Sequence, residues 1–184
     1  MDKKFRAFFA IDLPKELKQE MVNVIKLLQK KNPGKNIVWT KPENLHITLK
    51  FLGNVLPLQC EQFLPAVEDT ISQIQKFTLK LEKISLFPSK RSPRVIALLP
   101  SPMERLVALA CKIEEQVVRY GLQAETRAFK PHLTLARIKQ KGKNEFNDIA
   151  MPPLNFEVER LTLFRSEITH TGSRYEILQH ISLK

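Results

Sequence analysis

Residues 46–49 read HITL, and residues 132–135 read HLTL. Each stretch alternates polar with apolar residues, the pattern of a β-strand that is buried on one face. Side chains at positions i and i+2 of a strand point to the same side, so each histidine shares a face with its threonine. The two stretches therefore predict two strands, each presenting an imidazole and a hydroxyl on one face and anchored in the core by the other.

The sequence around these stretches repeats as well. From Pro14 to His46 is 32 positions, and from Pro100 to His132 is also 32. Further along, residues 76–89 (KFTLKLEKISLFPS) align with residues 153–166 (PLNFEVERLTLFRS). Two copies are too few for a solenoid. The duplication predicts a bilobal α+β fold with pseudo-twofold strand-helix-strand units, in which two antiparallel sheets flank a central cleft. We expect residues 1–184 to form a single domain made of two such lobes.

Apolar periodicity places the elements along the chain. It predicts strands at residues 5–12, 37–40, 45–52, 76–87, 94–99, 132–138, 154–165 and 174–183. Amphipathic helices are predicted at residues 14–31 and 58–75. A third helix is expected to start at a capping box in residues 101–104 and to end at Gly121.

Charge favours a polyanionic partner. The chain has 30 Lys and Arg against 19 Asp and Glu, a net charge of +11, and phosphates attract such a surface. A generic basic surface that aids solubility is the alternative interpretation.

The sequence has no apolar run of the ~20 residues that a membrane span needs, and its start lacks a signal-peptide core. Cys60 and Cys111 lie far apart, which argues against a disulfide framework or a zinc site. We expect a cytoplasmic protein without a membrane association.

Two histidines that face each other across a cleft suit phosphodiester chemistry. Opening a cyclic phosphodiester requires one group to deprotonate water and another to protonate the leaving oxygen, and imidazole can do either near neutral pH. Thr48 and Thr134 could hydrogen-bond the phosphate oxygens. No metal motif is present, so we expect no metal and no cofactor. Histidines with a packing or surface role remain the alternative, because a duplication would copy a structural histidine too.

Further candidates lie near these residues. Arg137 could grip phosphate bidentately, but on a flat strand it would face away from His132, so a twist, a bulge or the end of the strand must turn it toward the cleft. An ordinary surface arginine is the alternative interpretation. Other candidates for contacts to backbone phosphates are Arg94, Lys130, Arg165 and Arg174. Candidates for stacking on a base are Phe8, Phe9, Trp39 and Tyr175, with core packing the expected role of the two phenylalanines.

The chain resembles the 2H phosphoesterase superfamily, specifically the bacterial and archaeal RNA 2′,3′-cyclic phosphodiesterases, also called LigT-like 2′-5′ RNA ligases. The stretches that carry the resemblance are FRAFFAIDLP, ENLHITLKFLG, FKPHLTLARI, LTLFRSE and SRYE, and they extend essentially from end to end. The resemblance implies hydrolysis of terminal 2′,3′-cyclic phosphates to 2′-phosphates, and 2′-5′ ligation in some members.

Residue by residue, the resemblance implies that His46 and His132 are catalytic and that Thr48, Thr134 and Arg137 bind substrate. It suggests His46 as the acid and His132 as the base. We expect the partner to be RNA with a 2′,3′-cyclic phosphate end, and the protein to be a monomer. Two alternatives stay open: a physiological 2′-5′ RNA ligase, and an RNA-binding module without turnover.

Overall fold

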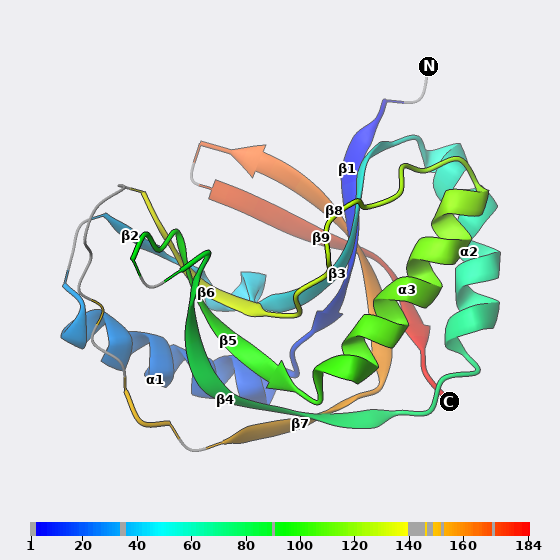
Figure 1. Cartoon of the computed structure of the whole chain (residues 1–184). Coiled ribbons are helices and arrows are strands. Elements are labelled where there is room, and N and C mark those ends of the chain that lie inside the picture. Colours follow the sequence, from blue (N-terminus) through cyan, green and yellow to red (C-terminus); the bar gives the residue numbers. More distant parts are fainter. Residues whose placement is uncertain are drawn as a thin grey trace.

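A curled antiparallel sheet forms the centre of the molecule, with helices packed along it (Figure 1). The computed structural model describes residues 3–33, 36–89, 91–139, 146, 149–151, 153–170 and 172–184. The expected mixture of helices and antiparallel strands is confirmed. Within the described residues, no helix is long and apolar enough to cross a bilayer.

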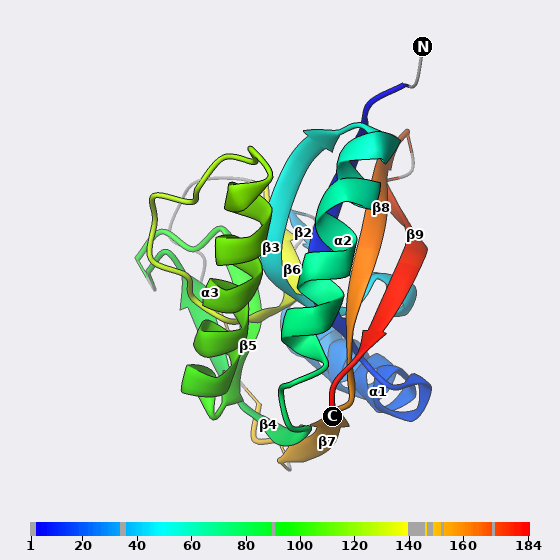
Figure 2. The same cartoon turned by 90° about the vertical axis from the view of Figure 1, so that its right-hand side faces the viewer.

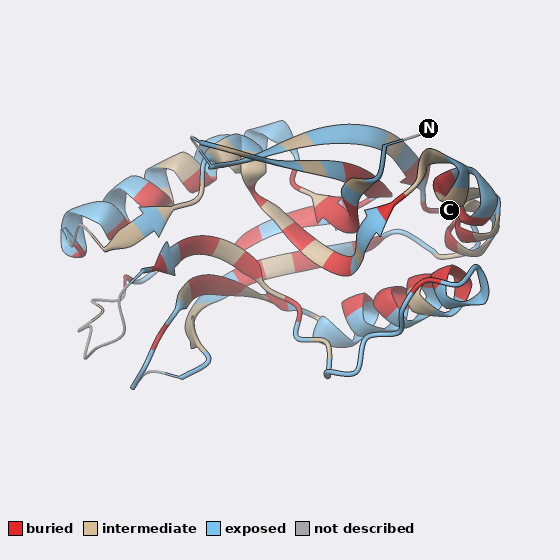
Figure 3. Ribbon diagram, turned by 90° about the horizontal axis from the view of Figure 1, so that it is seen from above, coloured by how far each residue is buried: buried red, intermediate tan, exposed pale blue. Residues whose placement is uncertain are grey.

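Three α-helices and one short 3₁₀ helix (η1) are found in the described chain: α1 Lys15–Lys31, η1 Pro42–Asn44, α2 Pro57–Ile71 and α3 Met103–Arg119. All three α-helices turn an apolar face into the main core cluster; α1, for example, buries Leu17, Met21, Ile25 and Leu28 at helical spacing. Figure 2 shows α2 and α3 side by side, and Figure 3 shows exposed residues on the outer turns of the helices.

Among the residues that the structure describes, nine strands make up the sheet: β1 Phe5–Asp12, β2 Ile37–Trp39, β3 His46–Val55, β4 Phe77–Phe87, β5 Val95–Ser101, β6 Leu133–Ile138, β7 Leu154–Val158, β8 Arg160–Thr169 and β9 Gly172–Ser182. Every predicted strand is found, within a few residues at its ends. The strand predicted at residues 154–165 is two strands, with a break at Glu159, whose carbonyl accepts the Leu183 N–H.

One prediction at a helix start is wrong. Ser101 does not cap α3: it is the last residue of β5, where it pairs with Lys80 of β4. The helix begins at Met103, and no side chain caps it. The ladder therefore holds the serine that the capping-box spacing had assigned to the helix.

The two expected sheets are in fact one sheet, with strand order β7-β4-β5-β6-β3-β1-β8-β9. The two halves join where β3 meets β6, through the pairing of Ile47 with Leu133. Beyond this point β6 pairs with β2 instead, from Trp39–Ala136 to Ile37–Ile138. The sheet therefore divides next to His46 and His132, because β3 and β6 separate there.

Two register shifts lie just beyond the histidines. On β3, Lys50 is opposite Phe9 and Thr48 is opposite Ala10, so Leu49 is an extra residue in its strand. On β6, Ala136 and Thr134 are opposite Ile96 and Ala97, which makes Leu135 the extra residue. Such bulges turn the residues that follow them to the other face of the strand.

Candidate active site

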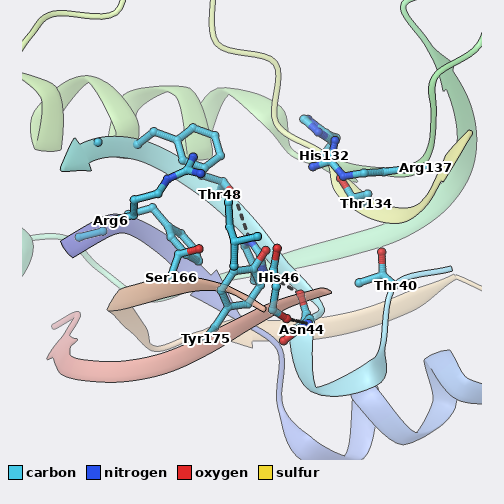
Figure 4. Close-up of a pocket in the computed structure, with 16 residues that line it drawn as sticks. Arg6, Thr40, Asn44, His46, Thr48, His132, Thr134, Arg137, Ser166 and Tyr175 are labelled. Atoms are coloured by element: carbon cyan, nitrogen blue, oxygen red, sulfur yellow. Dashed lines mark hydrogen bonds between the residues drawn. The ribbon is translucent and has the colours of Figure 1, made fainter. Parts of the chain in front are cut away.

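The division of the sheet opens a cavity of about 460 Å³. Its lining includes all five residues predicted for the site: His46, Thr48, His132, Thr134 and Arg137. Figure 4 shows His46 and Thr48 on one side of the cavity and the other three on the opposite side. The structure therefore brings together residues that are about 86 positions apart in the sequence.

Backbone carbonyls orient the two imidazoles in the same way. The Nδ1 atom of His46 lies 2.7 Å from the carbonyl oxygen of Asn44, and the Nδ1 atom of His132 lies 2.7 Å from that of Lys130. A carbonyl oxygen can only accept, so each Nδ1 carries the hydrogen and donates it. The Nε2 atom of each ring is left as the reactive nitrogen, able to accept or to carry the second proton.

Thr48 is bonded to its own histidine, as the shared face predicts. Its Oγ1 lies 3.0 Å from His46 Nε2. Since Nδ1 carries the hydrogen of the neutral ring, the threonine hydroxyl donates to Nε2. The hydroxyl and the imidazole therefore meet within hydrogen-bonding distance at the cavity wall.

Aromatic side chains surround His46 much more than His132. The His46 ring packs against Phe8 at 4.9 Å, Tyr175 at 5.1 Å and Phe164 at 6.0 Å between centroids. For His132 the ring contact is Phe87, at 5.3 Å. The pseudo-equivalent histidines thus have different surroundings, one enclosed by apolar rings and one nearer to solvent.

The enclosure has an electrostatic consequence. Burial lowers the pKa of His46 from 6.5 to about 4, against the opposing effects of the Asn44 hydrogen bond and the Asp12 carboxylate. The positive charges of Lys18 and His132 lower it further. In the free protein at neutral pH, His46 is therefore an uncharged imidazole whose Nε2 accepts a hydrogen bond.

The bulge at Leu135 explains how Arg137 reaches the cavity. Thr134 and Arg137 are three residues apart and would lie on opposite faces of a regular strand. The extra residue restores them to the same face, and Arg137 is exposed in the cavity wall. Of the three ways in which this side chain could be turned toward the cavity, the structure has the bulge.

Sequence reasoning missed Phe51. It stands five positions after His46, as Arg137 does after His132, and the bulge at Leu49 turns it toward the same cavity. Its side chain is 63% exposed, which is high for a phenylalanine. The repeat itself was the signal, because it places an aromatic ring where the other half has a guanidinium.

Other lining residues came from parts of the sequence without a catalytic pattern. Arg6, Thr40, Asn44, Ser166 and Ser173 add polar groups to the wall. Asn44 also holds the β8–β9 hairpin in place, since its Nδ2 donates to the Ser173 carbonyl at 2.8 Å. Because no aspartate or glutamate lines the cavity among the described residues, its charged groups favour an anion.

The further candidates for phosphate contacts and base stacking differ in whether they line the cavity. Arg94, Arg165 and Arg174 do not line this cavity, and neither does Lys130. Of the aromatic candidates, Tyr175 lines the cavity and Phe9 lies in the main core, while Trp39 packs against that core. Phe8 borders the cavity but is 2% exposed, in a small cluster with Ala10 and Phe164. Its contact with His46 fits core packing, the role expected for it.

Comparison with known proteins is consistent with this geometry. The family described as LigT like phosphoesterase matches the chain twice, at residues 11–97 and 98–175. An RNA 2′,3′-cyclic phosphodiesterase of Thermotoga maritima is 30% identical over 94% of this chain and 92% of its own. One of Methanocaldococcus jannaschii is 32% identical over 95% and 98%. Escherichia coli LigT, solved in complex with 3′-AMP, matches with a TM-score of 0.77 and 27% identity over 99% of both chains.

Proposed function

The chain belongs to the LigT like phosphoesterase family, and on that premise we propose that it hydrolyses 2′,3′-cyclic phosphate ends of RNA to 2′-phosphomonoesters. The observation that carries the proposal is the pair of imidazoles in one cavity, each with Nδ1 bonded to a carbonyl and Nε2 left reactive. The names of the Thermotoga and Methanocaldococcus relatives support the substrate. The 3′-AMP complex of E. coli LigT supports a ribonucleotide ligand.

The groups around the histidines suit a cyclic phosphate. Arg137 offers a bidentate donor pair to two phosphate oxygens, and Thr134 offers a hydroxyl from the same wall. Thr48 can exchange its bond to His46 Nε2 for one to phosphate, because a hydroxyl rotates freely between acceptors. The exchange would free Nε2 when the substrate arrives, and the phosphorus would be fixed between the two imidazoles.

Ring opening then needs one base and one acid. Water attacks phosphorus as its proton passes to one Nε2, while the other imidazolium donates its proton to the departing ribose 3′ oxygen. The 2′ oxygen keeps the phosphate, so the product is a 2′-phosphomonoester. Family resemblance suggests His132 as the base and His46 as the acid, and we adopt that assignment as a hypothesis.

The low pKa of His46 puts a condition on the acid role. With a pKa of about 4, roughly one free molecule in a thousand carries this proton at pH 7. The negative charge of the bound phosphate has to raise the pKa of His46 before the ring can serve as an acid. The kcat/KM profile should be bell-shaped, with limbs that belong to the pair.

An activated leaving group distinguishes the two histidines. A nitrophenyl phosphodiester releases a phenolate that needs no proton, so loss of the acid matters little for it. His46→Ala should then recover much of its lost rate, while His132→Ala stays slow. The opposite recovery would exchange the two roles.

The overall function is tested with an oligonucleotide that ends in a 2′,3′-cyclic phosphate. We expect conversion to a 2′-phosphate end by the native chain and a rate at least ~100-fold lower in either histidine variant. Product analysis with 5′-hydroxyl RNA present separates hydrolysis from 2′-5′ ligation. Binding of the oligonucleotide without any product would leave only an RNA-binding module and refute the proposal.

We also infer that the single domain consists of two duplicated units related by a pseudo-twofold axis. The double family match supports this, as does a strand order in which β6 and β3 are central and each is followed outward by the first strand of its half. The bulges at Leu49 and Leu135 lie at equivalent positions. We further propose that the chain acts as a monomer, since the proposed site needs no second copy. We propose the cytoplasm as its location.

A further inference from the structure

A buried lysine lies in β3, just beyond the bulge that follows Thr48. Lys50 is 6% exposed, and among the described residues it is the only charged side chain that is buried. Its Nζ lies 2.6 Å from a carboxylate oxygen of Glu114 on α3 and donates to the Gln123 carbonyl oxygen at 3.0 Å. A buried charge is tolerated when it is paired and hydrogen-bonded, and Lys50 meets both conditions.

Glu114 extends this contact to the segment between α3 and β6. Its other carboxylate oxygen accepts the backbone N–H of Glu125 at 2.7 Å. The segment, residues 120–132, has no regular secondary structure (Figure 1). In the described part of the chain, the hydrogen bonds that join residues 123–130 to another helix or strand end on Lys50 or Glu114. The ion pair therefore clamps this segment against β3 and α3.

The same segment carries the group that orients His132. The Lys130 carbonyl oxygen lies 2.7 Å from His132 Nδ1, and this bond keeps the hydrogen of the neutral ring on Nδ1 and the reactive lone pair on Nε2. A shift of the segment would move the carbonyl, so that the ring could turn or adopt the other tautomer. A misplacement of about 1 Å can lower a rate ~100-fold, even when it starts far from the chemistry.

His46 is supported in a different way. The carbonyl that orients it belongs to Asn44, which ends the 3₁₀ helix η1, and two backbone hydrogen bonds close that turn. Four residues after His132, where the first half of the chain has Lys50, the second half has the small residue Ala136. The clamp therefore works in one direction, because a lysine of the first half holds the segment that orients the histidine of the second.

We propose that Lys50 is a positioning residue for His132. Through Glu114 and the Gln123 carbonyl it holds the segment that carries Lys130, so that the imidazole keeps its Nδ1–H tautomer and presents Nε2 to the cavity. The effect on turnover rests on the proposed function, whereas the effect on the ring does not. An ion pair that only packed α3 against β3 would have no such effect on the ring.

Two variants separate positioning from stability. Lys50→Met leaves the Glu114 carboxylate without its partner, so the folded state should lose stability. The double variant Lys50→Met/Glu114→Leu replaces the pair by two apolar side chains, which often preserves the stability of a protein with a buried ion pair. It does not restore the bonds to Gln123 and Glu125. We therefore expect the double variant to have a urea midpoint near the native one and to keep the defect at His132.

Ring ¹⁵N NMR spectra measure the tautomer of His132 directly. At about pH 8, where an ordinary histidine is neutral, the native chain should show one protonated nitrogen, Nδ1. In both variants these signals should move toward the average of the two tautomers, while those of His46 stay unchanged. The spectrum of His132→Gln identifies the signals. An averaged signal in the native chain, or a native signal in the double variant, would overturn the proposal.

Turnover of an oligonucleotide with a 2′,3′-cyclic phosphate end is the second measurement. In Lys50→Met and in the double variant, kcat should fall roughly 10- to 100-fold. KM should stay close to the native value, because Thr134 and Arg137 still bind the phosphate. Lys80→Met is the matched control: it removes a strand lysine that pairs with Glu82 at 2.7 Å on the surface, and it should keep the native kcat. Equal losses of kcat in Lys80→Met and Lys50→Met would refute the positioning role.

The two measurements distinguish failure of this inference from failure of the proposed function. If even the native chain does not open the cyclic phosphate, the proposed function fails, and the ring spectrum still decides whether Lys50 positions His132. If the native chain turns over and the double variant has the native kcat, the proposed function stands and the ion pair serves stability alone.

Discussion

The low pKa of His46 predicts a specific dependence of stability on pH. The group has a pKa of about 4 in the folded chain and 6.5 as its ordinary value. Between these values the unfolded chain binds more protons than the folded one, so the free energy of unfolding falls as the pH drops from 6.5 toward 4. The stability that comes from the uncharged His46 is fully present above pH 6.5, and it is lost progressively as the pH falls from 6.5 to about 4.

The size of the effect follows from the two pKa values. The complete loss is about 3 kcal/mol, and the part lost between pH 7 and pH 5 is about 2 kcal/mol. Other groups titrate in this range too, so the difference between two chains is the quantity to measure. The substitution His46→Gln removes the titrating group. Between pH 7 and pH 5 the free energy of unfolding of this variant should therefore fall by about 2 kcal/mol less than that of the native chain.

Urea denaturation at both pH values, followed by the fluorescence of Trp39, measures the difference. Trp39 is the only tryptophan in the sequence, and it is half-buried. His170→Gln is the control, because it replaces an exposed histidine by the same residue and should keep the native pH dependence. An unchanged pH dependence in His46→Gln would refute the argument that the aromatic rings keep His46 uncharged.

Three further predictions concern turnover of a cyclic-phosphate oligonucleotide. Arg137→Ala should raise KM, since it loses a bidentate phosphate contact; unchanged steady-state kinetics would return Arg137 to an ordinary surface role. Thr48→Val and Thr134→Val should each cost about 1.5–3 kcal/mol in kcat/KM, one hydrogen bond to a charged acceptor, and a loss as large as in a histidine variant would mean that the hydroxyls do more than position phosphate. Activity should survive EDTA, because the proposed acid and base are imidazoles, and a loss that a divalent ion reverses would contradict this.

Local patterns predicted most of the fold and the two His/Thr pairs that line the cavity, while the family resemblance pointed to Arg137. The alternation around His46 and His132 identified their strands and their exposed faces, because burial on one side imposes a period of two. The spacing from Pro14 and Pro100 indicated the repeat. These signals are local or periodic, and a single sequence displays both.

The remaining features depend on long-range pairing. That β3 and β6 join the halves into one sheet follows from the pairing of Ile47 with Leu133, which no local pattern encodes. Ser101 was assigned to the start of a helix because Glu104 follows it at the spacing of a capping box. In the structure it pairs instead with Lys80 of β4, a residue far away in the sequence. Phe51 was missed because an exposed aromatic residue after a strand looks like any apolar residue until the bulge at Leu49 is known.

If the two halves of the sheet rotated against each other, the junction between them would be the pivot. In the described part of the chain, β3 and β6 pair at Ile47 and Leu133, and each of these residues directly follows a histidine of the site. Points beside a pivot move least when the two arms rotate about it. A small rotation of one half against the other would displace Phe51 and Arg137, farther out along the arms, much more than the two imidazoles. Such a rotation would therefore change the shape of the candidate active-site cavity more than it would change the separation of the two imidazoles.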